Sequence, residues 1–146
     1  MTTRSNVITV NQIGYFSFSP LRLGIGIAHT RYTCPLLRDE GEFVVNIPGT
    51  ALLDAVQICG SVSGRDCDKF REAGLQKAES LRVGAVSLPQ CGAQIECRVS
   101  REMAFEERTW FIGDVVAARK QPGHRGEEAL MCGRHNYMVP GETVAP

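Results

Sequence analysis

The chain has 146 residues, a length that suits one domain and is too short for two. A hydrophobic content of 43% is typical of a globular domain and argues against intrinsic disorder. Lys and Arg number 16 and Asp and Glu also number 16, so no overall field would attract nucleic acid or an anionic membrane. We therefore expect a single domain over residues 1–146 that binds neither, and whose functional charges are local.

Strand patterns dominate the chain. Apolar residues alternate with small or polar ones at 21–27 and 94–100, and the apolar set is expected to face inward. Residues 105–108 are typical of a hairpin turn between two strands. The predicted strands are residues 6–10, 21–27, 42–47, 94–100, 109–118 and 129–139.

The predicted helices are short and few. Each begins at a residue whose side chain can cap a helix and ends at a glycine. The first runs from Thr33 to Gly41, the second from Thr50 to Gly60, and the third from Asp66 to Gly74. About six strands with scattered helices predict a mainly β fold, a barrel or a sandwich.

The six cysteines form no C-x-x-C pair, and no histidine lies at a zinc-binding spacing from any of them. The N-terminus does not resemble a signal peptide, and no apolar run approaches transmembrane length. We expect free thiols, no metal site and a cytoplasmic location. Cys59 and Cys67 can be interpreted as a redox pair or as small buried residues.

The segment "AHTRYT" (28–33) follows a predicted strand and leads into a predicted helix. Free N–H groups and the helix dipole make such a place attractive to anions. Thr30 and Thr33 add hydroxyl groups, and Arg31 adds a planar cation suited to phosphate. The alternative is a helix cap with a surface arginine.

The segment "CGSVSGRDCDKF" (59–70) could also hold an anion. Ser63 and Gly64 let the backbone turn with its amide groups exposed, and Arg65 and Lys69 add two cations nearby. Aspartates at 66 and 68 partly neutralise these cations, so the segment is not a nucleic-acid patch. The alternative is a capped helix with charge pairs three residues apart.

Several common active-site patterns are missing from the sequence. "GIGIAH" (24–29) has histidine where a dinucleotide-binding motif needs its third glycine, and "GSVSG" (60–64) has valine where a nucleophile elbow needs serine. His29, His124 and His135 have no recognisable partner pattern, and no paired carboxylates are evident. Any chemistry would therefore come from a cofactor.

Five stretches match the motifs of one known family in order. They are "NVITV" (6–10, family N-x-M-T-x), "TRYT" (30–33, S-R-Y-T), "GEFVVNIP" (41–48, G-E-F-x-V-N-I-P), "CGSVSGRDCDKF" (59–70, C-G-x-x-S-G-R-D-x-D-K-F), and the late strands "IECRV" and "FIGDVVA" taken together. On these residues the chain resembles the flavin reductase-like, FMN-binding split-barrel family and is most similar to its flavoredoxin branch. The 59–70 segment is the most specific of the matches.

The resemblance implies a six-stranded antiparallel split β-barrel with short helices, its first strand missing or supplied in another way. It implies a homodimer with FMN near the subunit interface. Thr9, Val10 and Asn11 would border the flavin ring, with Asn46 on the strand beneath. Thr30, Arg31 and Thr33 would hold the phosphate, and Ser63, Gly64, Arg65 and Lys69 would complete the phosphate and ribityl side.

The function that this resemblance implies is an FMN-dependent oxidoreductase. NADH or NADPH would be the transient donor, and free flavin, ferric iron or a protein would be the acceptor. One alternative is an FMN electron carrier without reductase activity. Another is a split-barrel binding module without flavin, favoured by Ala28 where arginine is common, by Asn11-Gln12 near the ring and by the short N-terminus.

Overall fold

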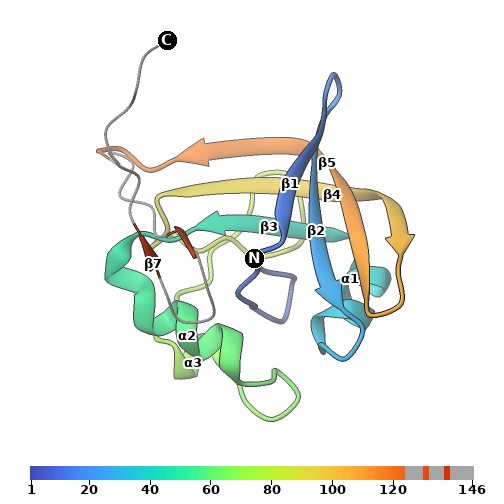
Figure 1. Ribbon diagram of the computed structural model, residues 1–146. Coiled ribbons are helices and arrows are strands. Elements are labelled where there is room, and N and C mark those ends of the chain that lie inside the picture. The colour runs from blue at the N-terminus through green and yellow to red at the C-terminus, as the bar shows by residue number, and fades with distance from the viewer. Residues whose placement is uncertain (124–129, 132–136, 139–146) are drawn as a thin grey trace.

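A five-stranded antiparallel sheet forms the body of the protein in a computed structural model that describes residues 1–123, 130–131 and 137–138 (Figure 1). The strand order is β1-β2-β5-β4-β3. Its strands are β1 (Ile13–Phe18), β2 (Leu21–Ala28), β3 (Glu42–Ile47), β4 (Ala93–Ala104) and β5 (Arg108–Lys120). A separate antiparallel pair consists of β6 (Leu130–Met131) and β7 (Tyr137–Met138).

The long strand β5 joins the two halves of the sheet. It pairs with β2 through residues 108–114 and with β4 through residues 109–120. Two register shifts in the β4–β5 ladder bend the sheet, so that β1 and β2 cross the direction of the other three strands (Figure 1). The curved sheet surrounds the main apolar core, which includes Ile25, Phe43 and Phe111.

Three helices and one 3-10 turn cover the open sides of this sheet. They are α1 (Thr33–Glu40), the 3-10 turn η1 (Thr50–Leu52), α2 (Leu53–Ser61) and α3 (Lys69–Glu72). Helix α1 adds Cys34 and Leu37 to the main core, whereas α2 and α3 pack with Leu88 and Cys91 in a second cluster. No helix among the described residues is both long enough and apolar enough to cross a membrane.

The strands predicted at 21–27, 42–47, 94–100 and 109–118 are confirmed, as is the turn at 105–108, where the Phe105 N–H donates to the Arg108 carbonyl at 2.8 Å. The predicted strand at 129–139 contains β6 and β7, and its other residues lie outside the described residues, as do His124, Cys132 and His135.

The predicted strand at 6–10 is wrong. The N-terminal segment turns back on itself, with the Ile8 N–H donating to the Met1 carbonyl at 3.0 Å, and only an isolated bridge joins Thr2 and Val7. The first strand is β1, which the sequence reading missed. Tyr15 and Phe16 stand side by side and obscure the alternation, because both faces of this strand carry aromatic residues.

The predicted helix caps also need correction. Thr33 is the first residue of α1 and not its cap, Thr50 begins η1, and α2 continues through Gly60 to Ser61. Asp68, not Asp66, caps α3 by accepting from the Phe70 N–H at 3.0 Å. Gly41 ends α1 as predicted, in a left-handed conformation with φ of 65°.

The first half of β4 is buried on both faces, although its pattern predicts one apolar face. Glu96 lies on the face opposite Cys97 and is only 1% exposed. Its two carboxylate oxygens accept main-chain N–H groups from Leu81 at 2.8 Å and Arg82 at 2.7 Å. These bonds hold the long 75–92 connection against the outside of the sheet.

We expect Glu96→Gln to lower the free energy of unfolding by about 2 kcal/mol, because one main-chain N–H would then face an amide NH2 group. Urea denaturation followed by circular dichroism measures this change. Glu102→Gln on the same strand is the control, since its ion pair with Arg38 is solvent-exposed and contributes less than about 1 kcal/mol. Equal losses of unfolding free energy in the two variants would contradict the role of Glu96 in holding the 75–92 connection.

Candidate functional site

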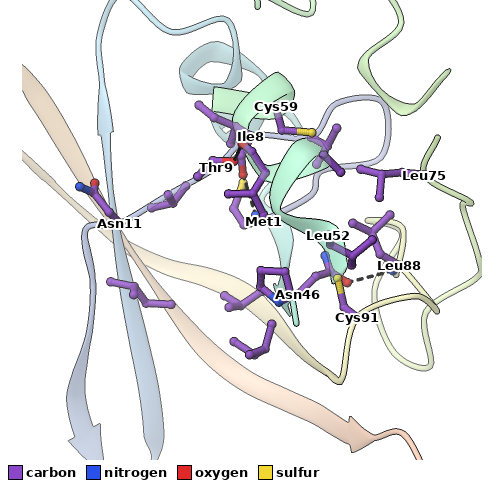
Figure 2. Close-up of a pocket in the computed structure, with 18 of the residues that line it drawn as sticks. Met1, Ile8, Thr9, Asn11, Asn46, Leu52, Cys59, Leu75, Leu88 and Cys91 are labelled. Carbon is purple, nitrogen blue, oxygen red and sulfur yellow. Dashed lines mark hydrogen bonds between the residues drawn. The ribbon is translucent and has the colours of Figure 1, made fainter. Parts of the chain in front are cut away.

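A pocket of about 310 Å³ lies between the N-terminal segment, the end of β3 and α2 (Figure 2). Its walls are mostly aliphatic. Among the described residues, no charged side chain lines it, and its polar side chains are those of Thr9, Asn11 and Asn46. The pocket therefore favours an uncharged, apolar group.

Asn46 lies in the pocket wall, but other parts of the protein occupy its amide. Its Nδ2 donates to the Thr2 Oγ1 at 3.0 Å and the Val44 carbonyl at 3.3 Å. Its Oδ1 accepts the Leu88 N–H at 2.9 Å, which Figure 2 shows as a dashed line. Asn46 thus ties the N-terminal segment and the 88–91 turn to β3.

Residues 9–11 carry the chain past the pocket toward β1. The Thr9 hydroxyl donates to the Val56 carbonyl at 2.5 Å, which holds this segment against α2. Val10 packs on the main core, whereas Asn11 is exposed and lies away from the other labelled side chains in Figure 2. This strip offers main-chain groups and one free side chain at the edge of the pocket.

Two loops within the segments that the sequence singles out, residues 30–33 of 28–33 and residues 63–65 of 59–70, lie against each other. The Arg65 guanidinium lies over the ring of Tyr32, 5.5 Å from its centroid. Gly64 is so close to Tyr32 and Asn6 that a Cβ there would lie 3.1 Å from the Tyr32 ring. The Asn6 amide donates to the Thr33 hydroxyl at 2.9 Å. Residues far apart in sequence thereby form one surface.

Lys69 is buried beside these loops and is only 4% exposed. Its ammonium group donates to the Cys59 carbonyl at 2.7 Å, near the end of α2, where carbonyl groups attract a cation. Burial lowers the pKa of Lys69, and the positive charge of Arg31 lowers it further, against the opposing effect of Cys59. Lys69 therefore fixes the end of α2 at the base of the loops.

The exposed arginines of the two loops are not neutralised by carboxylates. Neither Arg31 nor Arg65 forms an ion pair with any carboxylate in the part of the chain that the structure describes. Asp68 is used as the cap of α3 and does not pair with Arg65. The charge pairs of the alternative interpretation are thus not formed, and both guanidinium groups can bind an anion.

The structure divides the predicted site residues into two neighbouring groups. Thr9, Val10, Asn11 and Asn46 line the pocket. Thr30, Arg31, Thr33, Ser63, Gly64, Arg65 and Lys69 belong to the loop pair or lie at its base. The predicted set missed Asn6 and Tyr32, which hold the loops together. Both lie inside matched motifs, so the signal was present, but their contacts appear only in the fold.

The five cysteines that the structure describes are free thiols, as the sequence predicts. Burial raises the pKa of Cys59, and it raises the pKa of Cys91 to about 11. Cys67 is half-buried, with its thiol 3.6 Å from the Ser63 carbonyl. Cys59 fits the interpretation of a small core residue. No group of three potential metal ligands occurs within residues 1–123, 130–131 and 137–138.

Residues 1–139 match the sequence model of the flavin reductase like domain. The chain belongs to this family. An uncharacterized protein from Archaeoglobus fulgidus is 38% identical over 77% of this chain and 64% of its own length. The reductase component of an FADH(2)-dependent resorcinol hydroxylase from a Rhizobium species is 27% identical over 79% of this chain and 62% of its own length. The chain thus spans less than two thirds of both relatives.

Solved structures confirm the mainly β, split-barrel fold of this flavin reductase-like domain. A flavoredoxin from Desulfovibrio vulgaris (Miyazaki F) matches with a TM-score of 0.91 at 20% identity, over 99% of this chain and 86% of that one. An FMN-binding protein from Thermus thermophilus matches with a TM-score of 0.87 at 26% identity, over 97% and 82%. The main sheet described here has five strands, one fewer than expected.

Proposed function

We propose that this flavin reductase-like protein binds FMN and works as an oxidoreductase. The observation that carries the proposal is that the two loops bearing Arg31 and Arg65 lie against each other, with neither arginine paired to a carboxylate among the described residues. A phosphate carries up to two negative charges and accepts hydrogen bonds from guanidinium groups in a planar, paired geometry. The FMN-binding relative from Thermus thermophilus supports the choice of flavin.

The residues present suit FMN in two parts. Arg31 and Arg65 would hold the phosphate, with the hydroxyl groups of Thr30 and Ser63 beside them. The strip at 9–11 would border the ring next to an aliphatic pocket, where water is excluded. Thr33 and Lys69 would act by holding these elements, because each is buried and already bonded within the protein.

Bound flavin supplies hydride and electron transfer, and the protein supplies position and surroundings. The aliphatic wall beside residues 9–11 would shield the ring from solvent, and the exposed Asn11 would lie where a substrate approaches. NADH or NADPH would dock transiently as donor, and free flavin, ferric iron or a protein would accept the electrons. The free thiols are consistent with a reducing cytoplasm, in which we place this reaction.

We expect purified protein mixed with FMN and desalted to retain the absorbance bands of bound flavin between 300 and 550 nm. Arg65→Ala and Arg31→Ala should each weaken FMN binding by about one to two decades, because a charge-assisted hydrogen bond contributes about 1.5–3 kcal/mol. Titration of flavin fluorescence measures the dissociation constants. Arg101→Ala is the control, since it removes an exposed arginine of β4 outside both loops. Protein that stays colourless after loading would overturn FMN binding.

Reduction of the bound flavin by NADH or NADPH distinguishes a reductase from an electron carrier without reductase activity. We expect the flavin absorbance of the loaded protein to bleach under NADH or NADPH in the absence of oxygen, because a ring beside the exposed Asn11 is accessible to the donor. The relative named as a reductase component favours this outcome. Bleaching by dithionite but by neither nicotinamide would instead identify an electron carrier.

We also propose that the protein forms a homodimer through β1. This strand lies at one end of the sheet and pairs on one side only, with β2, in the described chain. Tyr15 is 69% exposed and Phe18 is 83% exposed, and their rings stack with centroids 5.8 Å apart. An exposed, apolar sheet edge is a typical site of strand pairing between chains.

Phe18→Asp should therefore convert the dimer to a monomer, which sedimentation equilibrium measures. Leu81→Asp is the matched control, because Leu81 is also exposed but lies in the 75–92 connection. A wild-type protein that sediments as a monomer at all concentrations would exclude this assembly.

A further inference from the structure

We propose that Asn6 is a positioning residue that sets the spacing between the 30–33 and 63–65 loops. The inference rests on the proposed function, in which these loops hold the phosphate of FMN. Asn6 is 3% exposed, and its side chain reaches both loops. In the described residues, no hydrogen bond joins it to the Arg31 or Arg65 guanidinium groups, so it acts through their neighbours.

The main chain around Asn6 is held rigidly. Its N–H donates to the Thr3 hydroxyl at 3.2 Å, and its carbonyl accepts the Thr3 N–H at 2.9 Å. Thr3 is itself fully buried, next to Thr2, which pairs with Val44 of β3. The Asn6 side chain therefore projects from a point that is fixed to the sheet.

On one side, the Asn6 amide holds the 30–33 loop. Its Nδ2 donates to the Thr33 Oγ1 at 2.9 Å, and both residues are buried. Thr33 begins α1, so this bond fixes the place where the loop becomes a helix. Arg31 lies two residues before that point.

On the other side, the Asn6 Oδ1 lies against Gly64. A Cβ on Gly64 would lie 2.3 Å from this oxygen, so only glycine allows the 63–65 loop to approach so closely. The next residue, Arg65, lies over Tyr32, the residue before Thr33. One buried amide therefore determines how far apart the two loops lie, and with them the two arginines.

Riboflavin has the ring and ribityl chain of FMN but no phosphate. Comparing the binding of the two ligands therefore distinguishes a role of Asn6 in positioning the phosphate loops from a role in general stability. We expect Asn6→Ala to weaken FMN binding about tenfold and riboflavin binding less than about twofold. A residue that only stabilises the fold would weaken both ligands equally. Gln94→Ala is the matched control, because it removes another buried amide, bonded to the Leu88 and Cys91 carbonyls, outside the loops. It should leave the ratio of the two affinities unchanged.

Gly64→Ala tests the same spacing from the other loop. We expect it to weaken FMN binding about tenfold in the wild-type background and less than about twofold in the Asn6→Ala background, where the atom closest to the added methyl group, the Asn6 Oδ1, is absent. If Gly64→Ala weakened FMN binding equally in the wild-type and Asn6→Ala backgrounds, the coupling between Asn6 and Gly64 would be overturned. An Asn6→Ala variant that weakens riboflavin binding as much as FMN binding would overturn it as well.

Hydrogen exchange of the flavin-free protein provides a readout independent of ligand. Asn6→Ala should speed amide exchange in both loops while leaving β4 and β5 unchanged, and unchanged exchange in either loop would overturn the inference. If the wild-type protein binds no FMN, the proposed function fails, and exchange in the flavin-free chain still decides whether Asn6 couples the loops.

Discussion

The pairing of Thr2 with Val44 is the interaction on which the candidate site depends. Two main-chain hydrogen bonds, of 2.8 and 2.9 Å, fix the N-terminal segment beside β3. From this anchor the chain passes Asn6, which contacts both loops, and Thr9, which bonds to α2. The segment contributes little regular structure of its own, but it connects the sheet, the pocket and the two loops.

Burial of polar groups explains the roles of several residues around the site. A polar or charged group removed from water must find a partner within the protein, or its burial costs free energy. Glu96, Asn46 and Lys69 each meet this need by bonding to main-chain groups of another element. Their bonds hold connections that have little regular structure, so these residues shape the surroundings of the site. The exposed arginines of the loops have no such partners in the described chain, which leaves them available to a ligand.

The sequence predicted the fold well where local patterns are strong. Alternation located β2 and β4, other β-rich runs indicated β3 and β5, and Gly41 marked the end of α1. It failed at 6–10, where an apolar, β-rich run forms no strand because its main chain bonds to Met1 and Thr3, residues of the same N-terminal segment. It failed again at β1, where aromatic residues on both faces removed the alternation. The choice between Asp66 and Asp68 as a cap depended on the path of the preceding loop, which local sequence does not encode.

For the candidate site, the sequence by itself predicted most of the residues that the two loops and the pocket contribute. The motifs at 30–33 and 59–70 contain the cations, the hydroxyl groups and the glycine, because side-chain chemistry and backbone freedom are local properties. Only the tertiary structure decided how they work. It buried Lys69 and Thr33 as supports, left Arg31 and Arg65 exposed, and placed Asn6 between the loops. The physical reason is that burial and hydrogen-bond partners depend on contacts between distant segments, which no local pattern contains.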